Sequence, residues 1–269
     1  MTLTEQLQTI GANARRAAQQ ISLAKAAQKT EALRAAAAAL RANSATILTA
    51  NARDLAENPT LNDALRDRLL LNEARIEAMA KGLETVAALP DPVGRVLETW
   101  ENPENGLRFE KRAVPLGVIG MIYESRPNVT ADAAALALKS GNRIILRGGS
   151  ESIHSSTAIA ACLAEGLAAA GLPAEAVQLI TTKDRDAVAW MLGAVGVIDV
   201  LIPRGGKSLT SRVQTEARVP TLLHLDGNCH VYIHAKADAA IAQKILQNAK
   251  LRRTGICGAA ESLLIDEAV

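Results

Sequence analysis

The stretch GVIGMIYESRPNVTADAAALALKSGNRIILRGG, residues 117–149, has a short apolar run at each end and helix-forming sequence between them. A strand, a helix and a strand at this spacing predict a βαβ unit with parallel strands. The same alternation continues, with predicted strands at 177–180, 197–203 and 221–225 and predicted helices at 155–170 and 184–192. The sequence therefore predicts an α/β fold in which a Rossmann-like parallel sheet carries helices on both faces.

The segments that flank this sheet have different patterns. Residues 1–89 are Ala-rich and predict helices, with breaks at Asn43-Ser44 and Asn58-Pro59 and a new start capped by Asn72. Residues 95–100 and 107–114 alternate as strands around a turn-rich 102–106, which predicts a two-stranded ribbon. A further α/β segment follows, with strands predicted at 230–233 and 262–265 and a helix at 238–251. We expect three parts: 1–115, 116–228 and 229–269.

Composition excludes several classes of protein. The chain has 269 residues, 49% of them hydrophobic, and 30 basic against 28 acidic residues give a net charge of +2. Five aromatic residues and no basic stripe argue against nucleic-acid binding. The longest apolar stretch, 113–123, is too short for a membrane helix. The first residues form an amphipathic helical pattern rather than a transit peptide, so we expect a cytoplasmic protein.

Two glycine pairs suit anion binding because each lies beside a basic residue and ahead of a helix. Gly148 and Gly149 follow Arg147, and Gly205 and Gly206 lie between Arg204 and Lys207. The alternative for each is a tight strand-to-helix turn with solvated cations. Two such loops on one sheet edge favour a dinucleotide. The sequence has no GxGxxG motif, and Leu201 stands where a Walker A motif needs glycine.

Three cysteines, an odd number without a CxxC pair, argue against a disulfide framework or a zinc ribbon. Cys257 lies between glycines and follows a basic helix end, so its thiol is a candidate nucleophile. The alternative is a buried structural cysteine, and Cys162 has that apolar setting. Cys229 lies near three histidines, but no carboxylate is spaced to complete a site, so we expect no metal.

These loops, in this order, resemble the aldehyde dehydrogenase superfamily and, within it, the glutamate-5-semialdehyde dehydrogenase branch. The resemblance extends from the N-terminal helices to Val269. Its most specific parts are PLGVIGMIYESRPNVT at 115–130, ILRGGSES at 145–152 and DGNCH at 226–230. It implies that residues 229–269 begin a catalytic domain, and that family members continue well beyond the last residue of this chain.

The resemblance also implies roles for individual residues. Cys257 matches the nucleophile, and Asn128 matches the amide that forms an oxyanion hole with the Cys257 backbone N–H. Arg147 and Ser150 replace a lysine and a ribose-binding glutamate, which favours NADP(H) as the cofactor. The remaining expected binding residues are Gly148, Gly149, Arg204, Gly205, Gly206 and Lys207 for the cofactor, and Glu124, Ser125 and Arg126 for the substrate's α-amino and α-carboxyl groups.

The reaction implied is the NADPH-dependent reduction of L-glutamyl 5-phosphate to L-glutamate 5-semialdehyde through a cysteine thioester, in proline biosynthesis. His224 stands where oxidative relatives have a general-base glutamate, which suits exchange with phosphate better than hydrolysis. Glutamate 5-kinase is a candidate partner, and a homo-oligomer is expected for the full-length protein. Two alternatives stay open: an inactive nucleotide-binding fragment, and an acylating aldehyde dehydrogenase with another substrate.

Overall fold

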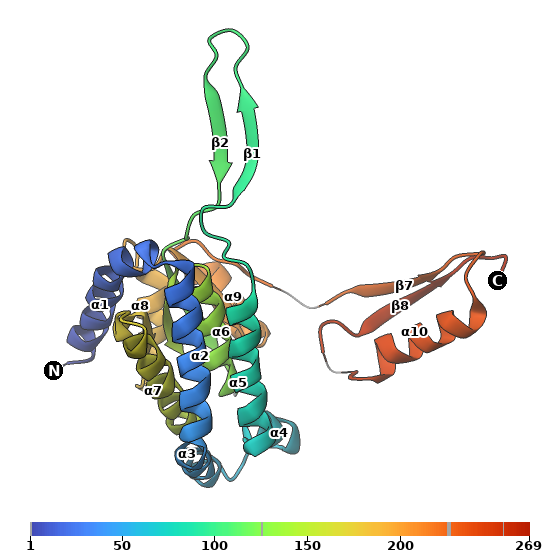
Figure 1. Ribbon diagram of the computed structural model, residues 1–269. Helices are drawn as coiled ribbons and strands as arrows, with labels where there is room; N and C mark the ends of the chain where they lie inside the picture. The colour runs from blue at the N-terminus through green and yellow to red at the C-terminus, as the bar shows by residue number, and fades with distance from the viewer. Residues whose placement is uncertain (1, 125, 225–226, 255) are drawn as a thin grey trace. The chain divides into compact units, whose positions relative to one another are not determined.

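The computed structural model describes residues 2–124, 126–224, 227–254 and 256–269. The described residues form two compact units, a first unit up to Leu223 and a second unit from His224 (Figure 1). The helices of the first unit are α1 Leu3–Leu23, α2 Ala26–Ala42, α3 Ser44–Glu57, α4 Asp63–Leu69, α5 Glu73–Ala88, α6 Asn128–Lys139, α7 Ile153–Ala169, α8 Asp186–Gly193 and α9 Lys207–Glu216. Its strands are β1 Val96–Glu101, β2 Arg108–Arg112, β3 Val118–Tyr123, β4 Arg143–Arg147, β5 Val177–Leu179 and β6 Val200–Arg204, with short 3₁₀ turns η1 Ser150–Ser152 and η2 Ala174–Ala176. The second unit contains β7 Cys229–Ile233, α10 Ala239–Leu251 and β8 Ala260–Ile265.

Four parallel strands form the sheet of the first unit, in the order β5-β4-β3-β6. Ile119 of β3 pairs with Ile144 of β4 on one side and with Val200 of β6 on the other. The chain runs outward from β3 through β4 to β5 and then returns to place β6 on the other side of β3. This reversal makes the gap between β3 and β6 a topological switch point. The predicted Rossmann-like parallel sheet is confirmed.

Side chains of the central strand alternate between two apolar cores, one on each face of the sheet. Ile119 and Tyr123 join the core that also holds buried residues of α2, α5, α6 and α7. Val118 and Ile122 join the other core, together with residues of α1, α8 and α9. Because successive strand residues point to opposite faces, a continuous apolar run supplies both cores at once. The prediction of helices on both faces is therefore confirmed.

Two of the N-terminal helices, α3 and α5, begin at predicted signals, whereas no predicted signal marked the break between α1 and α2 or the short helix α4. Asn72 caps α5 by accepting a hydrogen bond from the backbone N–H of Arg75, and α3 starts at Ser44. Helix α2 packs closely against α7, where a Cβ on Gly166 would lie 2.5 Å from the backbone nitrogen of Ala36. Gly166 therefore allows the two helix backbones to approach, which attaches the N-terminal helices to the sheet-covering layer.

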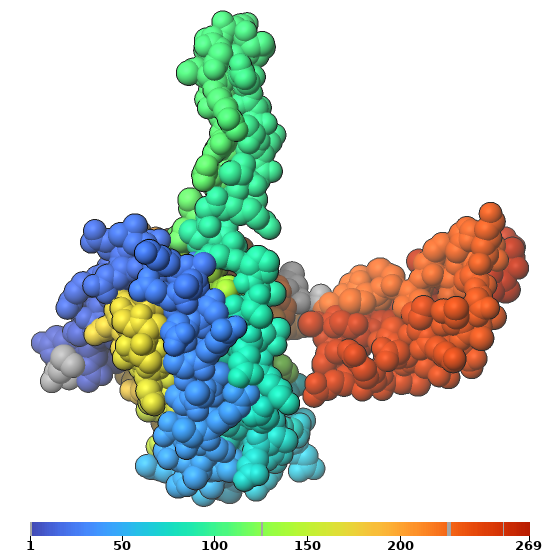
Figure 2. Space-filling view, viewed as in Figure 1, coloured from blue at the N-terminus to red at the C-terminus, as the bar shows by residue number. Residues whose placement is uncertain are grey.

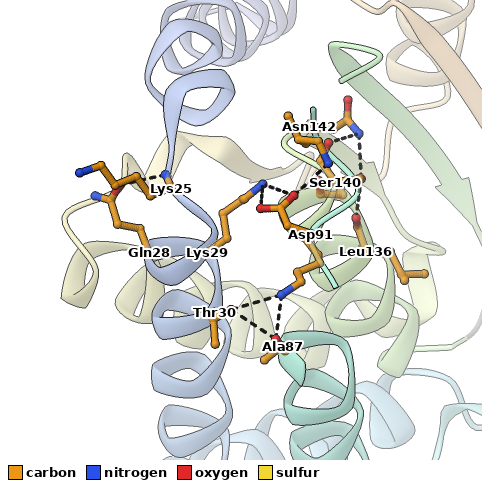
Figure 3. A network of polar contacts seen from close by, with 12 residues as sticks. Lys25, Gln28, Lys29, Thr30, Ala87, Asp91, Leu136, Ser140 and Asn142 are labelled. Atoms are coloured by element: carbon orange, nitrogen blue, oxygen red, sulfur yellow. Dashed lines mark hydrogen bonds and ion pairs between the residues drawn. The ribbon is translucent and has the colours of Figure 1, made fainter. Parts of the chain in front are cut away.

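A polar network ties the segment after α5 to α2 and α6 (Figure 3). The ammonium group of Lys29, which is 2% exposed, lies 2.7 Å from a carboxylate oxygen of Asp91. Lys139 donates to the carbonyl of Ala87 at 2.7 Å and to the hydroxyl of Thr30 at 3.2 Å. Burial lowers the pKa of Lys139, while Asp91 opposes that shift. Both buried cations thus have oxygen partners, as the cost of burying a charge requires.

Strands β1 and β2 form an antiparallel hairpin in which every strand residue is exposed. Figure 2 shows this hairpin in green, projecting from the first unit. The rings of Trp100 and Phe109 face each other across it, with centroids 5.3 Å apart. Gly106 has a φ of +69° in the connecting turn, a conformation that favours glycine. The predicted ribbon is confirmed, and its apolar side chains lie outside both cores.

The second unit consists of a parallel pair, β7 and β8, connected by α10. Asp238 caps α10 by accepting a hydrogen bond from the backbone N–H of Ile241. The strands and the helix agree with the segments expected from the sequence. Helix α10 has no buried residue, and Ile241 and Ile245 are exposed.

One predicted strand is wrong within the described residues. At 221–225 the structure has an isolated bridge between Thr221 and Leu201 instead of a strand, and Leu225 lies outside the described residues. Pro220 precedes this segment and cannot donate a hydrogen bond, so it shortens the ladder beside β6. In the part of the chain that the structure describes, no helix is both long and apolar enough to cross a bilayer.

Candidate functional site

The carboxyl ends of β3 and β6 meet at the topological switch point, where open α/β sheets bind their ligands. Tyr123 pairs with Arg204, and the backbone N–H of Glu124 donates to the carbonyl of Arg204 at 3.2 Å. The loop that follows β6 contains Gly205 and Gly206 and leads directly into α9. The structure therefore brings Glu124, a predicted substrate-binding residue, and the second glycine pair to one place.

The carboxylate of Glu124 lies against this second glycine pair. It accepts a hydrogen bond of 3.2 Å from the backbone N–H of Gly206, the N-cap residue of α9. A Cβ on Gly205 would lie 2.6 Å from the other carboxylate oxygen of Glu124, so glycine permits the close approach. The helix end at which we expected a phosphate thus holds a carboxylate of the chain itself. Its negative charge suits the positive end of the helix.

Arg204 and Lys207 lie on either side of Gly205 and Gly206, and both are exposed. Arg204 is the last residue of β6 and Lys207 is the first residue of α9. Arg126, also exposed, lies between β3 and α6, whereas Ser125 lies outside the described residues. The cationic side chains of these loops are therefore accessible to an anionic ligand.

The helix after the first glycine pair, α7, also has a carboxylate of the chain at its N-terminus. Asp54 of α3 accepts hydrogen bonds from the backbone N–H groups of His154 and Ser155, at 3.0 and 2.8 Å, and from the Ser155 hydroxyl. The Asp54 carboxylate is 1% exposed, and nothing in the sequence near Gly148 indicates it. Only the packing of α3 beside α7 reveals that this helix end has an internal anion.

A small hollow nevertheless lies beside the first glycine pair. It is lined by Gly148, Gly149, Ser150, Ile153, Ser156, Leu179, Ile180 and Thr182. Tyr123 packs against Gly148, where a Cβ would lie 3.1 Å from the phenol oxygen. Tyr123 is 1% exposed and shares a hydrogen bond of 2.6 Å with the hydroxyl of Thr130, and its burial raises the pKa of the phenol. The sequence analysis did not assign Tyr123 to this loop, although an aromatic residue at the end of a predicted strand could have indicated it.

Arg147 supplies the cation of this loop. Its guanidinium donates to the carbonyl of Gly148 at 2.8 Å, and its buried Nε has no hydrogen-bond partner among the described residues. Burial lowers the pKa of Arg147, and Glu151 opposes that shift. Ser150 is exposed, and its hydroxyl donates to Glu151 at 3.4 Å. Sequence reasoning did not assign Glu151, which places a carboxylate beside Arg147.

Asn128 is the first residue of α6, directly after Pro127. Its amide donates to the carboxylate of Asp132, one turn later, at 2.9 Å. Desolvation raises the pKa of Asp132, and this hydrogen bond lowers it. Because an amide group carries two N–H donors, Asn128 has a second one for another acceptor. The contact with Asp132 fixes the orientation of that donor.

Cys257 belongs to the second unit and is exposed in the turn before β8. The backbone N–H of Ala259 donates to the carbonyl of Ile256 at 3.0 Å and closes the turn. The thiol of Cys229 donates to the carbonyl of Cys257 at 3.4 Å, and a Cβ on Gly227 would overlap the same carbonyl oxygen. Cys257 is therefore accessible to a substrate, as its predicted role requires.

The remaining candidates do not form a site. Cys162 is 3% exposed within α7, where burial raises the pKa of its thiol, so its predicted place in the core is confirmed. His224, His230 and His234 are exposed. In the described parts of the chain, no three His, Cys, Asp or Glu side chains gather closely enough to hold a metal ion.

The parallel sheet and the two glycine-pair loops at its edge are typical of a dinucleotide-binding α/β protein. Similarity to known proteins agrees with that class. The profile of the aldehyde dehydrogenase family matches residues 2–269, so the chain belongs to the aldehyde dehydrogenase family. It is similar to the gamma-glutamyl phosphate reductase of Rhodospirillum rubrum, with 58% identity over 97% of this chain and 61% of the relative. The corresponding protein of Gluconobacter oxydans is 59% identical over 98% of this chain and 62% of the relative.

Solved structures agree with these relatives. The gamma-glutamyl phosphate reductase of Thermotoga maritima has a TM-score of 0.90 and 40% identity, over 97% of this chain and 63% of that one. The reductase of Saccharomyces cerevisiae has a TM-score of 0.74 and 34% identity, over 97% of this chain and 66% of that one. The chain spans about three fifths of the length of the curated relatives it matches. The predicted aldehyde dehydrogenase superfamily is confirmed, and these similarities support the predicted branch.

Proposed function

We propose that this chain contributes the cofactor-binding and nucleophile portions of a γ-glutamyl phosphate reductase. The reaction is the NADPH-dependent reduction of L-glutamyl 5-phosphate to L-glutamate 5-semialdehyde and phosphate. The observation that carries the proposal is the identity of 58–59%, over nearly the whole chain, to reductases of that name. A homo-oligomer, a glutamate 5-kinase partner and the division into parts 1–115, 116–228 and 229–269 stay predictions.

The residues around the sheet edge fit a phosphorylated dinucleotide. Arg147 is a half-buried cation with a buried Nε that lacks a partner among the described residues, and it adjoins the hollow beside Gly148 and Gly149. A phosphate on the adenosine ribose offers oxygens to such a group. Arg204, Gly205, Gly206 and Lys207 supply backbone donors and charge for the pyrophosphate. These residues favour NADP(H) over NAD(H).

The chain's own residues perform the acyl transfer. The Cys257 sulfur attacks the acyl carbon of L-glutamyl 5-phosphate, the carbon–oxygen bond to phosphate breaks, and a thioester forms. The Asn128 amide and the Cys257 backbone N–H stabilise the oxyanion. NADPH, when bound, would supply the hydride for the thioester carbon. The bond between that carbon and the Cys257 sulfur then breaks, which releases the aldehyde and restores the thiol. Arg126 and Glu124 are proposed, with Ser125, to bind the charged groups of the glutamate moiety.

The test is the reverse reaction of the purified chain with glutamate 5-semialdehyde and NADP⁺, followed by NADPH absorbance and by intact mass. With phosphate we expect continuous NADPH formation. Without phosphate we expect a single turnover that leaves a γ-glutamyl adduct on Cys257, because His224 stands where oxidative relatives have the general-base glutamate. Phosphate added later should remove the adduct.

Two variants complete the test. Cys257→Ala should form neither adduct nor NADPH while NADPH binding is retained, and Cys162→Ala should behave as the parent chain. An adduct that forms without Cys257, or NADPH formation that CoA supports and phosphate does not, would refute the phosphate-dependent reductase. The second result would indicate an acylating dehydrogenase with another acceptor.

A further inference from the structure

The second unit holds two of the three cysteines, and the fold brings them together. Cys229 is the first residue of β7, and Cys257 lies in the turn before β8. The two strands pair in parallel with Cys229 opposite Ala260, so the turn returns beside the start of β7. The Cys229 thiol then lies 3.4 Å from the carbonyl oxygen of Cys257. The cysteines are 28 positions apart in the sequence, and the pairing of β7 with β8 brings them close together.

The two thiols differ in exposure, and the sulfur of Cys229 lies against the backbone of Cys257. Cys257 is exposed and Cys229 is half-buried, so an oxidant reaches the first and the second is shielded. A disulfide needs Cα atoms roughly 4.4–6.8 Å apart. The sulfur of Cys229 already contacts the carbonyl oxygen of Cys257. To form the disulfide it has to move from that carbonyl to the sulfur of the same residue. Gly258 has open space where a Cβ would lie, which gives the turn room to adjust.

We propose that Cys229 is a resolving cysteine that forms a reversible disulfide with Cys257. The oxidant is a hydroperoxide. The Cys257 thiolate attacks the peroxide, the O–O bond breaks, and a sulfenic acid and an alcohol or water are produced. The Cys229 sulfur then attacks the sulfenic sulfur, water leaves, and the disulfide forms. A dithiol reductant reverses the step and restores both thiols.

The consequence for catalysis rests on the proposed function, in which Cys257 is the nucleophile. The disulfide blocks acyl transfer and also protects Cys257 from irreversible oxidation to sulfinic or sulfonic acid. Cys162 cannot substitute for Cys229, because it is 3% exposed within α7 of the first unit. Cys162 is therefore a matched control thiol for the experiment, because its replacement should leave the disulfide unaffected.

The experiment is treatment of the purified chain with hydrogen peroxide, read by intact mass and by peptide mapping without reduction. We expect the parent chain and Cys162→Ser to lose two hydrogen atoms and to yield a linked peptide pair that contains Cys229 and Cys257. Cys229→Ser should instead gain two or three oxygen atoms at Cys257. Reductant should restore the parent chain's mass but not that of Cys229→Ser.

Three outcomes would overturn the inference: higher oxidation of Cys257 in the parent chain with Cys229 still reduced, identical products from the parent chain and Cys229→Ser, or linkage between two chains. The mass readout requires no turnover. A linked pair in a chain that forms no γ-glutamyl adduct would refute the proposed nucleophile and leave the disulfide standing. An active chain without the linked pair would refute the disulfide alone.

Discussion

Replacement of Glu124 by Gln tests how the carboxylate at the switch point affects cofactor binding. Glu124 accepts the Gly206 N–H at 3.2 Å, at the helix end where a pyrophosphate is proposed to bind. The amide oxygen of Gln can accept the same hydrogen bond, so the substitution removes the charge and keeps the contact. A pyrophosphate oxygen that uses the same group of N–H donors would lie about 4–5 Å from the carboxylate. In the dielectric of an exposed site, the repulsion is about 1 kcal/mol.

We therefore expect Glu124→Gln to bind NADPH about fivefold more tightly than the parent chain. Direct titration of NADPH fluorescence measures this, and the gain should shrink as salt increases, because ions screen exposed charges. Glu98→Gln, on the exposed hairpin, makes the same change in net charge and should leave the affinity unchanged. Unchanged or weaker NADPH binding in Glu124→Gln would refute the reasoning. Weaker aldehyde binding at constant NADPH affinity would instead support the predicted substrate role.

Three further predictions concern the framework around the site. Gly166→Ala should destabilise the chain by about 2 kcal/mol in urea unfolding, because a Cβ 2.5 Å from a backbone nitrogen of α2 forces the helices apart and outweighs the better helix propensity of Ala. Gly193→Ala, with nothing within 4 Å of the added Cβ, should cost no stability, and equal losses in the two variants would contradict the packing argument. Asp54→Ala should cost about 3 kcal/mol, since two backbone donors of α7 and a hydroxyl lose their buried acceptor, and a loss below about 1 kcal/mol would show that water replaces it. Burial lowers the pKa of Lys139 from 10.5, so the unfolded chain binds more protons than the folded chain between the lowered pKa and 10.5, and the free energy of unfolding should rise with pH in that window. Lys139→Met should lack this rise in urea titrations, and equal slopes for the two proteins would contradict the shift.

Several features of the fold follow from local sequence alone. The apolar runs that become β3 and β4 are bounded by glycine, and the helix between them is rich in Ala, so strand and helix assignments depend on neighbouring residues only. The cap at Asn72 follows in the same way, since a capping side chain bonds to a backbone group three residues away. The predicted strand at 221–225 failed because pairing depends on β6, which the local pattern does not describe.

In the candidate site, too, some features depend on local sequence and others on tertiary contacts. The sequence by itself indicated candidate residues for the site: the glycine pairs, the adjacent cations and Cys257 from the chemistry of short loops, and Asn128 from the family resemblance. Only the tertiary structure decided which of these groups are engaged by others. It placed Asp54 on the N-terminus of α7, Glu124 on Gly206 and Cys229 against Cys257. Each of these contacts joins residues at least 28 positions apart in the sequence, and a periodic pattern carries no information about partners at that range.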